Sequence, residues 1–166
     1  MTMGLPLWKN RSALLLILLL ACTHSRAQSQ RTMQLELPNL DGTSFIRLDQ
    51  FAGRPMVLNF WSSDCPPCIA EMPMLFKEAT QYPDVQFLGV AVENRASATK
   101  FLEHQGVTYP QVIALPTTDG IMRRFGNPKG LLPYTVVLSK SHQLCQMKTG
   151  VVNAAWIRSA VAKCSA

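Results

Sequence analysis

The chain has 166 residues, of which 48% are hydrophobic and 16% are charged, and its formal net charge at pH 7 is +6. This length fits one domain once an N-terminal segment is set aside. The basic residues are scattered apart from Arg123-Arg124, a pattern that argues against a nucleic-acid-binding surface.

The N-terminal segment has the features of an export signal. Lys9 and Arg11 precede an unbroken aliphatic run over residues 14–20. The apolar stretch of residues 13–22 is about half as long as a membrane span, which needs ~20 residues, so a signal is favoured over a transmembrane helix. We therefore expect a signal peptide over residues 1–21, without which the chain carries 14 bases and 10 acids, a net charge of +4.

Two cleavage sites fit this signal. Residues 19–22, Leu-Leu-Ala-Cys, resemble the bacterial lipobox, in which Cys22 becomes the lipid-bearing first residue, and this is the reading we favour. Residues 25–27, Ser-Arg-Ala, are an ordinary small-x-small cleavage site, and Cys22 is then only a small apolar residue of the signal. In both cases the mature protein leaves the cytoplasm, with residues 22–32 as a polar, flexible tether and residues 33–166 as the folded domain.

Short apolar runs bounded by turn signals predict strands in the folded domain. These runs cover residues 35–37, 45–48, 56–61, 85–92, 135–138 and 144–149. Helical patterns cover residues 65–82, 96–105, 118–125 and 153–163.

The order of these elements predicts an α/β fold. Asp41-Gly42 is a hairpin turn signal between the first two strands. Strand, helix and strand over residues 56–92 form a βαβ unit, which calls for a parallel pair, and the last two strands are close enough to form a hairpin. The prediction is a mixed central β-sheet with helices on both faces and an N-terminal β-hairpin extension.

The most informative motif is Cys65-Pro66-Pro67-Cys68, at the junction between the strand of residues 56–61 and the helix that follows. A Cys-x-x-Cys pair at such a junction is the arrangement that thiol–disulfide exchange requires. Three residues are nearly one helical turn, so both sulfurs lie on one face within bonding reach. The motif therefore indicates a redox protein.

The positions of the two sulfurs predict their roles. Cys65 at the helix N-cap is exposed to a partner's disulfide and would attack it, whereas Cys68, one turn further in, would resolve the mixed disulfide. Pro66 and Pro67 lack the amide N–H groups that could donate to the Cys65 sulfur, and the charge of Asp64 disfavours a second negative charge beside it. We therefore expect a weakly stabilised thiolate and a reducing protein.

These motifs extend to a family. The chain resembles the TlpA/ResA-like thiol–disulfide oxidoreductases, an exported and membrane-tethered branch of the thioredoxin superfamily, over roughly residues 33–163. The matching stretches are residues 40–42 (LDG), 48–55, 57–61 (VLNFW), 65–73 (CPPCIAEMP) and 132–138 (LPYTVVL).

The resemblance implies a thioredoxin fold and a substrate-binding surface made of Trp61, Pro66, Pro67, Leu132 and Pro133. In this superfamily the proline that corresponds to Pro133 follows a cis peptide bond and faces the Cys-x-x-Cys pair. Its neighbour's backbone is then free to pair with an extended substrate chain.

Glu71 is a candidate third catalytic residue. Asn59 takes the position where cytoplasmic thioredoxins carry a buried carboxylate, and an amide cannot act as a base. Glu71 follows Cys68 by three residues on the same helical face, and we hypothesise that it modulates proton transfer to or from Cys68. The alternative is an ordinary surface glutamate near the start of a helix.

The resemblance also implies a function in the cell envelope: a periplasmic lipoprotein that reduces disulfides in exported client proteins. It implies an upstream membrane dithiol donor, and apocytochrome or copper-centre proteins as the class of client, as in cytochrome c biogenesis. The chain has no flavin or nicotinamide signature, so no cofactor is expected. A disulfide-forming oxidant and a non-catalytic module that binds a metal or an apoprotein thiol stay open as alternatives.

Two further cysteines remain. Cys145 lies in the strand of residues 144–149, and Cys164 lies at the end of the stripe that Trp156 and Ala160 begin on the last helix. A strand followed by a helix that doubles back brings the two cysteines together, which favours a structural disulfide in an oxidising compartment. Two unbonded thiols are the alternative.

No metal site is expected. Zinc requires four ligands, and the chain offers no second Cys-x-x-Cys pair. His24, His104 and His142 are isolated in the sequence, and Met72 and Met74 beside the dithiol are more typical of packing or substrate contact than of Cu(I) binding.

Overall fold

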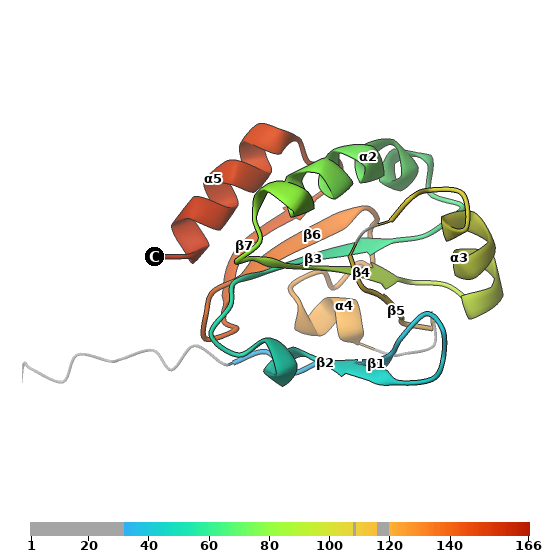
Figure 1. Ribbon diagram of the computed structural model, residues 1–166, viewed down its shortest axis with the longest axis horizontal. Coiled ribbons are helices and arrows are strands. Elements are labelled where there is room, and N and C mark those ends of the chain that lie inside the picture. The colour runs from blue at the N-terminus through green and yellow to red at the C-terminus, as the bar shows by residue number, and fades with distance from the viewer. Residues whose placement is uncertain (1–31, 108, 116–119) are drawn as a thin grey trace, which may run out of the picture.

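The computed structural model describes residues 32–107, 109–115 and 120–166 (Figure 1). The expected signal peptide, the tether up to residue 31 and Cys22 lie outside the described residues. The strands are β1 (Glu36–Pro38), β2 (Phe45–Arg47), β3 (Met56–Trp61), β4 (Gln86–Ala91), β5 (Gln111–Ile113), β6 (Tyr134–Leu138) and β7 (Leu144–Thr149). The helices are η2 (Leu48–Phe51, a 3-10 helix), α2 (Pro66–Gln81), α3 (Arg95–Leu102), α4 (Ile121–Arg124) and α5 (Ala154–Cys164).

Five strands form a mixed central sheet in the order β5-β4-β3-β6-β7. β3 pairs in parallel with β4, and β4 with β5, whereas β3 pairs antiparallel with β6, and β6 with β7. The predicted βαβ unit and the predicted C-terminal hairpin are thus confirmed. β3 lies in the middle of the sheet and all six of its residues are buried, so the segment that follows it starts from a rigid support.

The first two strands form a separate two-stranded antiparallel sheet, as the Asp41-Gly42 signal predicted. Gly42 has φ +74°, a left-handed conformation that glycine adopts without strain, and the Thr43 backbone N–H donates to Asp41 Oδ1. Leu37, on β1, packs into the core beneath the sheet. The hairpin extension therefore covers one face of the sheet, together with α4 (Figure 1).

Side chains alternate along β3 between two cores. Leu58 and Phe60 pack with α4 and the hairpin, whereas Val57 packs with α2 and α5. Trp61 points to the same side as Val57 and packs with α2 and α3. Helices thus lie on both faces of the sheet, as predicted.

Two elements differ from the prediction. β5 was not predicted from the sequence, and its three residues are all buried beside β4. The helix expected over residues 118–125 comprises only Ile121–Arg124 within the described residues, and it follows Gly120, which has φ +86°. An L-residue helix does not extend through that left-handed conformation, so α4 begins after it.

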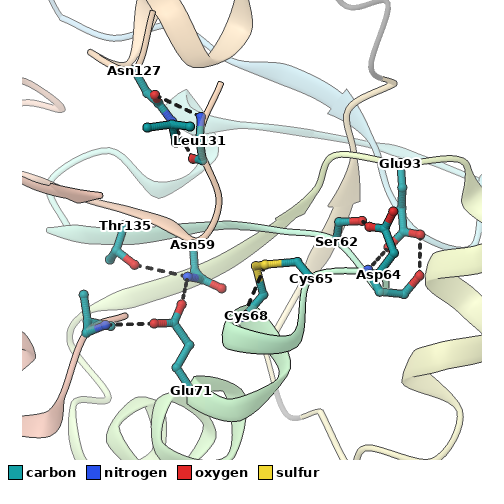
Figure 2. Close-up of a disulfide and its surroundings, with 12 residues drawn as sticks. Asn59, Ser62, Asp64, Cys65, Cys68, Glu71, Glu93, Asn127, Leu131 and Thr135 are labelled. Carbon is teal, nitrogen blue, oxygen red and sulfur yellow. Dashed lines mark hydrogen bonds between the residues drawn. A yellow bond between two sulfur atoms is a disulfide. The ribbon is translucent and has the colours of Figure 1, made fainter. Parts of the chain in front are cut away.

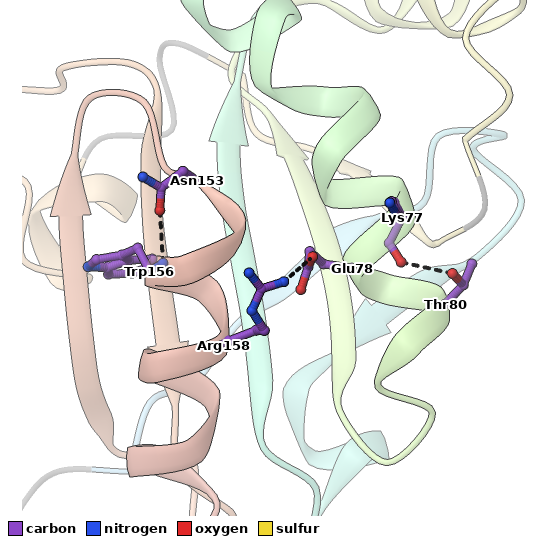
Figure 3. A network of polar contacts seen from close by, with 6 residues as sticks. All are labelled: Lys77, Glu78, Thr80, Asn153, Trp156 and Arg158. Carbon is purple, nitrogen blue, oxygen red and sulfur yellow. Dashed lines mark hydrogen bonds and ion pairs between the residues drawn. The ribbon is translucent and has the colours of Figure 1, made fainter.

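A buried carboxylate joins the two helices on the upper face. Glu78 of α2 is 2% exposed, and its Oε1 accepts a hydrogen bond from Arg158 Nη1 of α5 at 3.2 Å (Figure 3). Glu78 Oε2 is buried without a hydrogen-bond partner in the part of the chain that is described. The carboxylate therefore depends on a single partner, whose own side chain is 53% exposed.

This dependence predicts unequal effects of removing the two partners. Arg158→Met leaves a buried carboxylate unpaired and is expected to lower the free energy of unfolding by about 2 kcal/mol. Glu78→Met leaves only an exposed guanidinium, which water solvates, and is expected to lower it by less. Urea unfolding of the two variants measures the difference, and equal losses would contradict this account.

Candidate functional site: a disulfide at the start of a helix

The motif cysteines are bonded to each other. Cys65 and Cys68 form a disulfide with an S–S distance of 2.02 Å, at the junction where β3 leads into α2 (Figure 2). Cys65 is the N-cap of α2, with Pro66 as the first helical residue, as predicted. Cys65 is half-buried and Cys68 is fully buried, which is the order of exposure that the predicted roles require.

The environment of the Cys65 sulfur is poor in donors. Its one hydrogen bond in the described structure comes from the Cys68 backbone N–H at 3.3 Å. Pro66 and Pro67 have no N–H to add, and both are exposed. The carboxylate of Asp64 is exposed and accepts a hydrogen bond from Ser62 Oγ.

A second carboxylate holds the turn in front of the disulfide. Glu93, which follows β4, accepts hydrogen bonds from the backbone N–H of Ser63 at 2.7 Å and from the Ser63 hydroxyl at 2.6 Å (Figure 2). Glu93 is 8% exposed. Glu93 was not predicted from the sequence, because only the parallel pairing of β3 with β4 brings it beside the turn.

Glu71 lies below the disulfide and is buried, so the surface alternative is wrong. Its Oε1 accepts from Asn59 Nδ2 at 2.8 Å and its Oε2 accepts from the Val152 backbone N–H at 2.8 Å. Burial raises the pKa of Glu71 above its ordinary value of 4.5, and these two hydrogen bonds with the charge of Lys148 offset only part of the rise. A carboxyl group with a raised pKa beside a dithiol is suited to proton exchange.

The loop before β6 approaches the same cluster. The Leu132-Pro133 peptide bond is cis, as the resemblance implied, and Leu132 packs against the core that contains Cys68. Asn127 holds this loop through both polar atoms of its side chain, donating to Leu131 O at 2.7 Å and accepting from Leu131 N at 3.2 Å. Asn127 was not predicted from the sequence, since nothing in its local pattern marks this contact.

The prediction that Trp61 binds substrate is corrected. Its side chain is fully buried, donates through Nε1 to Gln111 Oε1 at 3.0 Å and packs against Phe101. No part of Trp61 is open to a client protein. Trp61 instead belongs to the core that supports Cys68 from below.

The second pair of cysteines lies elsewhere in the fold. Cys145 of β7 and Cys164 of α5 form a disulfide with a Cα–Cα distance of 5.8 Å. Cys164 is 2% exposed, so this bond is a structural link between the last strand and the last helix. In the described ranges, no group of three or more His, Cys, Asp or Glu side chains is placed to hold a metal ion.

Comparison with known proteins agrees with this geometry. Residues 29–147 match the AhpC/TSA family. The thiol-disulfide oxidoreductase ResA of Geobacillus thermodenitrificans is 31% identical over 122 residues, which are 70% of this chain and 66% of ResA. ResA of Geobacillus kaustophilus is 33% identical over 109 residues, or 64% of this chain and 60% of that protein.

The solved structure of MTB DsbF, in its mixed oxidized and reduced forms, superposes with a TM-score of 0.68 at 25% identity and covers 80% of this chain and 96% of DsbF. The chain spans two thirds or less of the length of the two ResA proteins. With its thioredoxin fold and its disulfide at the junction of β3 and α2, the chain belongs to the AhpC/TSA family and is similar within it to the ResA thiol–disulfide oxidoreductases.

Proposed function

We propose that this protein is a thiol–disulfide oxidoreductase that reduces disulfides in exported client proteins. The observation that carries the proposal is that Cys65, at the N-cap of α2, is half-buried, whereas Cys68, to which it is bonded, is fully buried. The Cys65 thiolate attacks one sulfur of a client disulfide, and the other client sulfur leaves as a thiolate. Cys68 then attacks Cys65, which releases the second client thiolate and closes the Cys65–Cys68 disulfide, so two electrons pass to the client.

The direction of transfer follows from the stability of the Cys65 thiolate. A strong oxidant owes its potential, about −120 mV for DsbA against about −270 mV for thioredoxin, to a stabilised thiolate in its reduced form. Here Cys65 receives one backbone hydrogen bond in the described structure, two prolines follow it, and the Asp64 charge precedes it. These features support a potential near the thioredoxin end.

Trapping of mixed disulfides tests the roles of the two cysteines. Cys68→Ala is expected to accumulate covalent adducts with disulfide-bearing proteins, because Cys65 still attacks but nothing resolves the adduct. Cys65→Ala is the matched control and is expected to form none, since the buried Cys68 cannot reach a client. Adducts in both variants or in neither would overturn the assignment, and their absence in both is the result that a non-catalytic binding module gives.

Equilibration of the purified protein with glutathione buffers tests the direction. We expect a midpoint within about 50 mV of thioredoxin. A midpoint potential near that of DsbA would overturn the proposed reductant function and favour the alternative, a disulfide-forming oxidant.

The proposed location is the periplasm, with the protein anchored to a membrane as a lipoprotein through Cys22. Among the described residues, no helix combines the length and the apolarity that crossing a bilayer requires. The support is the signal-like sequence of residues 1–21 and its lipobox. The mass of the mature N-terminus is expected to show acylated Cys22, and a mature chain that begins after Ala27 would contradict the anchor.

The partners belong to the same proposal. Each catalytic cycle leaves the Cys65–Cys68 pair oxidised, so a dithiol donor must reduce it again, and a membrane protein with such a dithiol would be placed to do so. The proposed clients are apocytochrome or copper-centre proteins, whose cysteines must be reduced before they bind haem or copper.

A further inference from the structure

The side-chain oxygen of Asn59 is a buried acceptor without a donor. Asn59 is 2% exposed, and its Oδ1 has no hydrogen-bond partner among residues 32–107, 109–115 and 120–166. Its Nδ2 donates to Glu71 Oε1 at 2.8 Å and to Thr135 Oγ1 at 3.1 Å. These two bonds fix the orientation of the amide, because a flipped amide would turn its oxygen against the Glu71 carboxylate.

The position of Asn59 in β3 determines which part of the molecule its side chain faces. Asn59 is flanked by Val57 and Trp61, and these alternate residues point to the face that α2 covers. Trp61 packs with Cys68. The amide oxygen of Asn59 points toward the disulfide, whereas the amide nitrogen of the same side chain points toward Glu71 (Figure 2).

A disulfide has no hydrogen to donate to this oxygen, whereas a thiol has one. We propose that Asn59 Oδ1 accepts a hydrogen bond from the Cys68 thiol in the reduced protein. The inference rests on the proposed function, because it concerns the dithiol that reduction produces. In that reduction the S–S bond breaks, a donor dithiol is oxidised to a disulfide, and its two protons end on Cys65 and Cys68.

This hydrogen bond would give the two cysteines of the reduced protein different protonation states. A buried unpaired acceptor is unfavourable, so the oxygen favours the form in which Cys68 carries a proton. Hydrogen bonding to a neutral group disfavours its ionisation, and Cys68 therefore stays a thiol while Cys65 ionises and attacks. Asn59, a residue of the central sheet, would therefore have a role of its own in the site. The resemblance to cytoplasmic thioredoxins implies only that a base is missing at this position.

Infrared spectroscopy of the S–H stretch tests the bond. The full chain with Cys22→Ser and Cys65→Ser keeps Cys68 as its one thiol, since the remaining cysteines form the Cys145–Cys164 disulfide. We expect a band at lower frequency than in the same chain with Asn59→Leu, which is of similar size but has no acceptor. One control keeps the oxygen: Thr135→Val removes a partner of Asn59 Nδ2 and is not expected to move the band.

A band that is unchanged by Asn59→Leu would overturn the proposal, because the Cys68 thiol would then not donate to Asn59. If Asn59→Leu does not fold, the ¹³C resonance of the Asn59 side-chain carbonyl replaces it. That resonance is expected to shift between the Cys65→Ser chain and the Cys65→Ser/Cys68→Ala chain, and no shift would overturn the bond. Trapping by Cys68→Ala with an unmoved S–H band would refute this inference and leave the proposed function standing.

Discussion

Replacement of Glu71 by glutamine is expected to slow the reduction of insulin disulfides about 100-fold, the lower end of what general acid–base catalysis contributes. Glu71 is buried on the same face of α2 as Cys68, and its carboxylate can take up the proton that Cys68 loses as it attacks the mixed disulfide. Glutamine keeps the size of the side chain and can still accept from Asn59, but it cannot exchange a proton.

The pH profile separates this role from a packing defect. Glu71 must be ionised to accept a proton, so the wild-type rate is expected to fall as the pH falls through the raised pKa of Glu71, above 4.5. Glu71→Gln is expected to lack this limb. Glu78→Gln is the matched control, because Glu78 is equally buried two turns further along α2 and has no place in the reaction.

Stability gives a second readout of the same carboxyl group. Because folding raises the pKa of Glu71, its protonated form is favoured in the folded state. Its contribution to stability is fully present below the unfolded pKa, near 4.5, and is lost as the pH rises through the folded pKa. Between these values, acidification is expected to stabilise the wild type relative to Glu71→Gln. A rate and a stability profile that are the same in both proteins would show that Glu71 does not titrate in the folded protein.

The sequence predicted this site as far as local patterns reach. The strand over residues 56–61, the N-cap position of Cys65 and the burial of Cys68 follow from a short apolar run, turn residues and helix geometry, all of which act within a few residues. The burial of Glu71 does not, because its partners come from β3 and from the segment between β7 and α5, 12 and 81 residues away.

Long-range pairing also explains the other differences. β5 has three residues and no alternation, and its strand character comes from pairing with β4, which no window of its own sequence reveals. Glu93 and Asn127 hold the two loops beside the disulfide through contacts set by the sheet and by a turn. The local sequence pattern around each residue gives no signal for such contacts, so the motif predicts the dithiol but not the residues that support it.

Loss of the Cys145–Cys164 disulfide is expected to lower the free energy of unfolding by about 3 kcal/mol. The bond joins residues 19 apart, and closure of a loop of this length removes conformational entropy from the unfolded chain. Cys145→Ala/Cys164→Ala is the variant, and its melting temperature is expected to fall by roughly 10 °C for a domain of this size.

The other disulfide of the same chain is the control. Cys65→Ala/Cys68→Ala opens a loop with a sequence separation of 3, for which chain entropy predicts roughly half the loss. The comparison distinguishes a structural disulfide from a catalytic one. Opening Cys145–Cys164 is expected to reduce stability but not the rate of insulin reduction, since α5 stays attached to α2 through Glu78–Arg158. Equal losses of stability from both double variants would contradict this division, because the Cys65–Cys68 bond would then be as structural as the other.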